Sequence, residues 1–168
     1  MRSNELRIRP ATAADAATVL GFIRALAAFE REPGAVEVDV ATLRTQLADP
    51  LPPFECLLCE RDGEALGFAL YFFAYSTWRG RRVLHLEDLF VAPGARRAGV
   101  GLALMRALAR IAVARDCARF EWSVLDWNED ALRFYRRLGA APVPGWTVLR
   151  LSGAPLASLA APAPPERG

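Results

Sequence analysis

The stretch that most constrains the fold is residues 84–112, LHLEDLFVAPGARRAGVGLALMRALARIA, where an expected strand gives way to a helix. An apolar run with two adjacent acids ends in Ala-Pro-Gly, and an Ala/Leu-rich segment follows two arginines and two glycines. The spacing of Leu102, Met105, Leu108, Ala109 and Ala112 predicts a helix over 99–115. Arginine and glycine do not fill a core, so this junction is expected to meet a charged group.

The bulk composition is that of a folded protein with one core of ordinary size. The 168 residues are 53% hydrophobic and 24% charged, and the net charge of +2 is too balanced to attract nucleic acid. No apolar run reaches the roughly 20 residues that span a bilayer, so no membrane partner is expected. The first ten residues, MRSNELRIRP, lack an apolar signal core, which predicts a cytoplasmic protein.

Hydrophobic periodicity and turn residues predict the order βααβββαβαβ, an α/β single domain. Strands are expected at 5–9, 54–60, 65–75, 82–91, 120–124 and 146–151. Four helices are expected. The first follows a capping box at Thr12–Asp15 and ends near Phe29, and the second runs from Asp39 to Pro50. The third covers 99–115, and the fourth begins after Asn128 and ends at Gly139. The domain is predicted to cover residues 1–152, with a disordered Ala/Pro-rich tail at 153–168.

The motif Cys56-Leu57-Leu58-Cys59 raises the possibility of a metal or redox site. It lies in an expected strand, where positions three apart point to opposite faces and cannot chelate one ion. No second CxxC and no HxxxH completes a zinc site, so both cysteines are predicted to be buried apolar residues and no metal is expected.

Glycines at the end of a strand and the start of a helix let backbone N–H groups approach an anion such as pyrophosphate. Two nucleotide motifs are excluded here. The chain has no lysine for a P-loop, and the third glycine of a Rossmann fingerprint is absent after Gly99-Val100-Gly101.

The motif that fits is R-x-x-G-x-G, read as Arg96-Arg97-Ala98-Gly99-Val100-Gly101. Here the sequence resembles the GCN5-related N-acetyltransferases (GNAT), which bind acetyl-CoA through [QR]-x-x-G-x-[GA] between a strand and a helix. The segments IRPATAAD, GFALYFF, LEDLFV and FYRRLGA resemble the diamine (spermidine/spermine) and thialysine acetyltransferase branch. This resemblance covers residues 5–151 and implies a mixed, mostly antiparallel central sheet flanked by helices.

The resemblance also implies the residues that bind the co-substrate acetyl-CoA. The expected cofactor-binding residues are Leu89, Phe90, Val91, Arg96, Arg97, Ala98, Gly99, Val100, Gly101, Leu102, Asn128 and Ala131. The backbone of 89–91 is expected to pair with the pantetheine arm, and the Leu89 N–H to face the thioester oxygen. Asn128 is also expected to cap a helix.

Acetyl transfer to an amine by direct attack needs a base, because an alkylamine with a pKa near 10 is protonated at neutral pH. Glu87 is the candidate base, acting through water, and His85 is a candidate for the same proton path. Strict alternation would place Val83, His85, Glu87, Leu89 and Val91 on one face and Asp88 on the other. By resemblance, Tyr135 is the candidate acid that protonates the leaving sulfur.

The acceptor is expected to be a small cationic amine. The candidate substrate-binding residues are Phe29, Glu30, Trp78, Glu87, Asp88 and Trp146. The sequence departs from the polyamine pattern, since Ser76-Thr77-Trp78 stands where Asp-Pro-Trp is typical and Phe29 replaces a tyrosine. A thialysine-like or lysine-like amine is therefore favoured at least as much as a diamine or polyamine.

Two other functions stay open. One is a GNAT enzyme for a different amine, such as a peptide N-terminus or an aminoglycoside, and the other is a non-catalytic acyl-CoA sensor. Nucleic-acid binding through Arg79, Arg81, Arg82 and the arginines of 133–137 is disfavoured, because no aromatic stacking motif accompanies them. The resemblance also predicts a homodimer, with the C-terminal part of each subunit at the interface.

Overall fold

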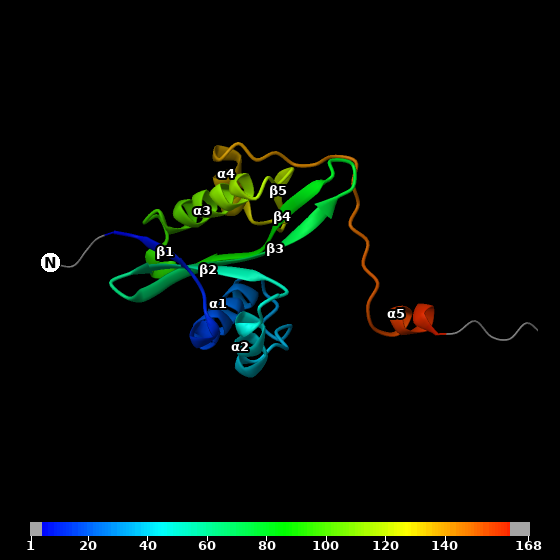
Figure 1. The fold of residues 1–168 in the computed structure, drawn as a ribbon, viewed down its shortest axis with the longest axis horizontal. Helices are drawn as coiled ribbons and strands as arrows, with labels where there is room; N and C mark the ends of the chain where they lie inside the picture. The colour runs from blue at the N-terminus through cyan, green and yellow to red at the C-terminus, as the bar shows by residue number, and fades with distance from the viewer. Residues whose placement is uncertain (1–4, 162–168) are drawn as a thin grey trace, which may run out of the picture. The chain divides into compact units, whose positions relative to one another are not determined.

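A five-stranded sheet, ordered β1-β2-β3-β4-β5, organises the first 123 residues (Figure 1). Its strands are β1 (Arg7–Pro10), β2 (Glu55–Arg61), β3 (Glu64–Ser76), β4 (Arg81–Val91) and β5 (Arg119–Trp122). Neighbouring strands are antiparallel except β4 and β5, which run parallel and are joined through the crossover helix α3 (Val100–Ala114). The mixed, mostly antiparallel sheet expected from the sequence is confirmed.

The computed structural model describes residues 5–161. The chain divides between Ser123 and Val124 into two compact units. The second unit contains α4 (Glu129–Arg137) and α5 (Gly153–Ala160).

Helices cover both faces of the sheet in the first unit. In Figure 1, α1 (Ala16–Phe29) and α2 (Val40–Ala48) lie on one face and α3 lies on the other. Single 3-10 turns precede α1 at Ala13–Asp15 and follow β4 at Pro93–Ala95. The core under α1 and α2 is formed by Ala16, Val19, Leu20, Leu43, Cys56, Leu58, Phe68, Leu70 and Phe90.

Local signals in the sequence begin and end these elements as expected. The Asp39 carboxylate accepts a hydrogen bond of 2.7 Å from the Thr42 N–H and so caps α2. Asp62 and Gly63 both have positive φ, as a two-residue hairpin turn between β2 and β3 requires. Cys56 and Cys59 are buried free thiols, which confirms their interpretation as core residues.

One expectation about the C-terminal part was wrong. Residues 146–151 form no strand within the described chain, and Val148 and Leu149 remain exposed there. A strand forms only where a second strand pairs with it, and periodicity cannot supply the partner. Within the segment predicted to be a disordered tail, residues 153–160 form the exposed helix α5, whose Ala and Leu residues favour helix in spite of Pro155. The rest of the predicted tail, from 162 on, lies outside the described residues.

Candidate active site

The loop from Ala92 to Gly99, called the β4–α3 loop, has a backbone suited to an anion. Arg97 and Gly99 both have positive φ, 64° and 83°. Left-handed residues alternating with ordinary ones turn successive N–H groups toward a common side, which makes an anion-binding concavity. The first N–H groups of α3 have no carbonyl one turn earlier, and the helix dipole adds positive potential at the same end. The loop therefore fits a pyrophosphate without any lysine.

Gly67 in β3 sets the position of the α3 N-terminus. A Cβ at Gly67 would lie 2.6 Å from the Phe90 carbonyl oxygen and 3.1 Å from Val100 Cγ1, too close for any side chain. Val100, the first residue of α3, is buried against this gap. Sequence analysis did not assign Gly67 a role, although a lone glycine inside a strand signals close approach of another segment.

β4 has an unpaired edge immediately before the β4–α3 loop. β3 pairs with β4 as far as Val91, whereas the register with β5 ends at Leu86↔Trp122. Residues 87–91 therefore have no strand beside them on the β5 side in the described register. Backbone groups on such an edge can pair with an extended amide-containing ligand, as expected for the pantetheine arm.

A β-bulge at Glu87 corrects the predicted faces of β4. Asp88 pairs with Leu70 and Leu86 with Tyr71, so Glu87 is the extra residue. Asp88 and Phe90 consequently lie on the α1 face, together with His85, which pairs with Phe72. Leu89 and Val91 lie on the opposite face, toward α3, and not with Val83 and His85 as strict alternation predicted.

The bulge brings Glu87 and Asp88 to the same side of the sheet. Glu87 Oε2 lies 3.7 Å from His85 Nε2, and the His85 ring contacts the Phe72 ring at a tilt of 35°, with centroids 4.9 Å apart. Burial, together with the nearby carboxylates of Glu87 and Glu30, raises the pKa of Asp88 to about 6. Burial also raises the pKa of Glu30. We call Glu30, Glu87 and Asp88 the acid cluster.

A cluster of three carboxylates suits a cationic amine. A positive charge placed beside Asp88 would relieve repulsion from Glu87 and Glu30 and favour the ionised carboxylate. The Glu87 side chain is 57% exposed, which leaves room for an intervening water. The structure thus brings together three of the six residues expected to bind the acceptor.

A contact between Phe29 and Arg96 joins the end of α1 to the β4–α3 loop. The Arg96 guanidinium carbon lies 5.2 Å from the centre of the Phe29 ring and 5.9 Å from that of Phe90. Arg96 Nε also donates to the Val91 carbonyl at 3.4 Å. Phe29 at the end of α1 is therefore in contact with the β4–α3 loop.

Trp78 does not join the acid cluster within this chain. It is 90% exposed in the turn between β3 and β4. Asp88 lies seven residues along β4 from Arg81, roughly 23 Å at the usual strand rise. Trp146 is exposed in the second unit.

Tyr135, Asn128 and Ala131 lie in or beside α4 in the second unit. The Asn128 side chain accepts a hydrogen bond of 3.2 Å from the Ala131 N–H, which confirms the predicted cap. Burial raises the pKa of Tyr135 to about 12, so the phenol holds its proton at neutral pH. A protonated, largely buried phenol is a suitable proton donor to a departing thiolate.

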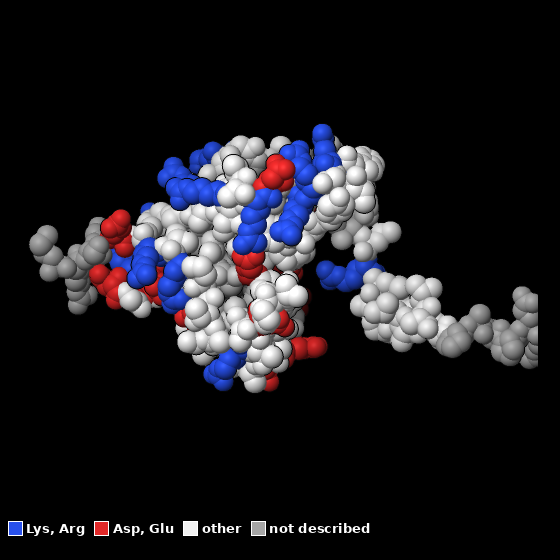
Figure 2. All heavy atoms as spheres, in the orientation of Figure 1, with Lys and Arg blue, Asp and Glu red and all other residues white. Residues whose placement is uncertain are grey.

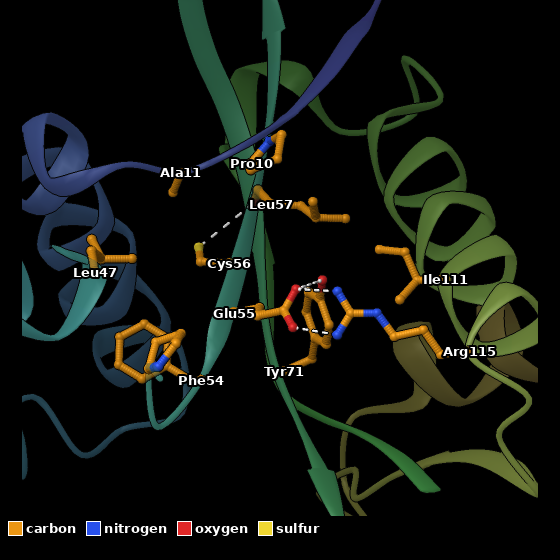
Figure 3. Close-up of a pocket in the computed structure, with 11 residues that line it drawn as sticks. Pro10, Ala11, Leu47, Phe54, Glu55, Cys56, Leu57, Tyr71, Ile111 and Arg115 are labelled. Carbon is orange, nitrogen blue, oxygen red and sulfur yellow. Dashed lines mark hydrogen bonds and ion pairs between the residues drawn. The ribbon is translucent and has the colours of Figure 1, made fainter. Parts of the chain in front are cut away.

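A cavity of about 240 Å³ lies where β1 ends beside β2, and no member of the acid cluster lines it (Figure 3). Its polar groups are already paired. The Glu55 carboxylate accepts two hydrogen bonds from Arg115, of 2.6 and 3.0 Å, and one of 2.8 Å from the Tyr71 hydroxyl. A carboxylate neutralised in this way is a poor site for a cationic amine.

Several arginines are paired with acids. Arg81 contacts Asp116 at 3.1 Å and Arg119 contacts Glu121 at 2.6 Å, while Arg133 pairs with Asp130. On the face drawn in Figure 2, basic and acidic side chains are interspersed. Across residues 5–161 no helix is long and apolar enough to cross a bilayer, and no three His, Cys, Asp or Glu side chains are arranged to hold a metal ion.

Comparison with known proteins places this geometry in a family. Residues 22–140 match the model of the acetyltransferase (GNAT) family. Thialysine N-epsilon-acetyltransferase of Mus musculus is 36% identical over 165 residues, 92% of this chain and 96% of that protein. Spermidine/spermine N(1)-acetyltransferase-like protein 1 of Homo sapiens is 31% identical over 164 residues, 92% of this chain and 24% of that longer protein.

The fold also matches a solved structure. A solved integron cassette protein from the mobile metagenome of V. cholerae superposes with a TM-score of 0.78 at 25% identity, covering 92% of this chain and 97% of that one. The chain belongs to the GNAT family and is an N-acetyltransferase that uses acetyl-CoA.

Proposed function

We propose that this enzyme acetylates a primary amine of a small cationic acceptor, with a thialysine-like amine ahead of a diamine or polyamine. The observation that carries the proposal is the acid cluster, two of whose members, Glu87 and Asp88, lie on the unpaired edge of β4. The relatives named for thialysine acetylation cover nearly the whole chain and support the same acceptor class. The serine in place of an acid at position 76 removes one charge that a long polyamine would use.

Acetyl-CoA supplies an activated acetyl thioester, and the chain's own residues would hold and orient it. The β4–α3 loop and the α3 N-terminus would bind the pyrophosphate through backbone N–H groups, with added charge from Arg96 and Arg97. The open edge of β4 at Leu89–Val91 would bind the pantetheine amides, and the Leu89 N–H would stabilise charge on the thioester oxygen. From the second unit, Asn128 and Ala131 would contribute further cofactor contacts.

The acceptor amine must lose a proton before it attacks. Glu87 would accept that proton through a bridging water, since its carboxylate is exposed and adjoins His85. Asp88 and Glu30 would hold the cationic end of the acceptor, with Phe29 as an apolar wall. Tyr135 would donate its proton to the departing sulfur.

The test is release of free CoA thiol from acetyl-CoA with a panel of amines. Thialysine, lysine, putrescine, spermidine, an aminoglycoside and a peptide N-terminus sample the competing acceptor classes. We expect turnover with thialysine or lysine and a lower kcat/KM with spermidine. Turnover confined to the aminoglycoside or the peptide would overturn the acceptor assignment. Tight acetyl-CoA binding without turnover of any amine in the panel would favour a non-catalytic acyl-CoA sensor.

We also propose a homodimer. The second unit exposes apolar side chains at Val143, Trp146, Val148, Leu149, Leu151, Leu156 and Leu159. A series of exposed apolar residues of this kind marks an interaction surface, and residues 146–151 would gain strand partners in a second copy. Light scattering on the purified chain should give twice the monomer mass of 18.4 kDa, and Leu149→Asp should shift it toward the monomer. The free thiols of all three cysteines support a cytoplasmic location, which stays a proposal.

A further inference from the structure

The last turn of α1 contacts both halves of the proposed site. Phe29 lies under the Arg96 guanidinium of the β4–α3 loop. The next residue, Glu30, is close enough to Asp88 to raise the pKa of that carboxyl. Two consecutive residues thus join the loop to the acid cluster.

This turn ends in a conformation that costs energy. The Glu32 N–H bonds the Ala27 carbonyl at 2.9 Å, and the Arg31 N–H bonds that of Ala28 at 3.2 Å. That pattern places Arg31 at the left-handed position, with φ of 68°, where glycine is usual. A side chain at this position carries strain, so the helix end depends on contacts with neighbouring elements.

Arg96 supplies such a contact from the loop. Its guanidinium lies against the rings of Phe29 and Phe90 and is fixed to β4 by its hydrogen bond to the Val91 carbonyl. A cation over an aromatic face is attracted by the ring quadrupole, and two rings hold the group from two elements. The side chain therefore ties the end of α1 to β4.

We propose that Arg96 is a positioning residue for the amine acceptor: its guanidinium fixes Phe29 and Glu30 against β4. Its backbone remains part of the loop that meets the phosphates. This inference rests on the proposed function, because the acid cluster matters here as the acceptor site. By this proposal the two arginines of the motif differ in role. Arg96 contributes to the binding of both acetyl-CoA and the amine, whereas Arg97 contributes to the binding of acetyl-CoA alone.

Arg96→Met and Arg97→Met form a matched pair for the test. Each removes one positive charge from the loop, so each is expected to weaken acetyl-CoA binding by a similar factor. Arg96→Met alone should also raise the KM for the amine, by roughly two- to fivefold, the size of one exposed cation–π contact. Arg96→Lys, which keeps a cation over the rings, should restore most of the loss. An equal amine KM in the two Met variants, or no recovery with Lys, would overturn the proposal.

Amide hydrogen exchange of residues 26–31 gives a second measurement that needs no acceptor. Exchange should be faster in Arg96→Met than in Arg97→Met, and adding Phe29→Leu to Arg96→Met should accelerate it little further. Equal exchange in the two Met variants would contradict the role of Arg96. If the wild-type enzyme acetylates no amine, the proposed function fails, while the exchange rates still decide whether Arg96 holds the end of α1.

Discussion

The β4–α3 loop and the acid cluster lie on neighbouring parts of β4, but different chemical groups build them. The loop owes its character to backbone geometry, with positive φ at Arg97 and Gly99 and the free N–H groups at the start of α3. The acid cluster consists of carboxylates from the end of α1 and from β4, and burial raises the pKa of Glu30 and of Asp88.

This difference determines which substitutions and which changes of pH each site can tolerate. A site made of backbone N–H groups keeps its charge distribution at every pH and is damaged mainly by residues that cannot adopt its φ angles. A site made of carboxylates needs no special φ, but Asp88 loses its charge when the pH falls below its raised pKa. Substitution and titration should therefore separate the two sites experimentally.

The largest effect is expected for Gly99→Val. Valine is strained at φ of 83°, so the loop would change its backbone and acetyl-CoA affinity should fall at least roughly 100-fold. A Cβ at Gly99 would lie 3.8 Å from Leu6 Cδ1, so backbone conformation and not packing within the chain is the obstacle. Gly94→Ala is the control, since its Cβ would meet nothing within 4 Å. Isothermal titration with normal binding by Gly99→Val would contradict the assignment of the loop.

Tyr135→Phe should change neither the β4–α3 loop nor the acid cluster. It removes a proton donor and keeps the ring, so kcat should fall by roughly ten- to a thousandfold, with acetyl-CoA affinity near wild type. Steady-state kinetics and direct titration of acetyl-CoA check the two halves of this expectation. Unchanged turnover would remove Tyr135 from the mechanism.

Asp88→Asn tests the acid cluster, the site that is built from side chains. Loss of one carboxylate should raise the amine KM by roughly tenfold and leave acetyl-CoA affinity unchanged. In the wild type, Asp88 loses its charge as the pH falls through about 6, so the amine KM should rise below that pH. In Asp88→Asn, the KM should be high already and rise less. A wild-type profile that stays flat between pH 5 and 7 would rule out Asp88 as the titrating group.

Asp88→Asn should weaken binding of the amine, but it should stabilise the fold. Because the pKa of Asp88 is raised on folding, the folded state binds the proton more tightly than the unfolded chain. Stability is therefore lost as the pH rises from about 4 to about 6, and asparagine avoids that loss. Asp88→Asn should raise Tm at pH 7 and leave it nearly unchanged at pH 3.5. Calorimetry at the two pH values measures this difference.

Gly67→Ala is expected to act on stability and not on charge, because it displaces the α3 N-terminus through packing. The added Cβ would meet the Phe90 carbonyl and Val100, which should cost about 1–3 kcal/mol of unfolding free energy. Gly21→Ala inside α1 is the control, because nothing lies within 4 Å of its Cβ and alanine favours helix. Denaturant unfolding should show the two alanines moving stability in opposite directions. Equal stabilisation by both would mean that α3 moves aside freely.

Local patterns predicted most of the fold. The strands that became β2, β3 and β4 were expected within one residue at each end, because tight turns and alternation are encoded in neighbouring residues. The strand expected at 146–151 was wrong, since its pairing depends on a partner that the local sequence does not name. The loop motif was equally local, and its helix begins at Val100, one residue after the predicted start.

The candidate site was predictable as a list of residues but not as an arrangement. The contact of Arg96 with Phe29 joins residues 67 positions apart, and nothing in either segment indicates it. Gly67 constrains α3 through a distance that appears only when β3, β4 and α3 are assembled. Asp88 was expected to point away from Glu87, and the bulge reversed that relation.

The bulge at Glu87 makes this site depend on the length of β4 as well as on its composition. Deleting Glu87 would remove the bulge and leave a regular ladder in which Asp88 and Phe90 keep the α1 face and Leu89 and Val91 keep the α3 face. A deletion between Leu89 and Val91 would instead exchange the faces of the residues that follow it. The bulge therefore lets β4 carry one more carboxylate than its partner strand has positions for, so an acid can be gained or lost at this point without disturbing the edge that meets the cofactor.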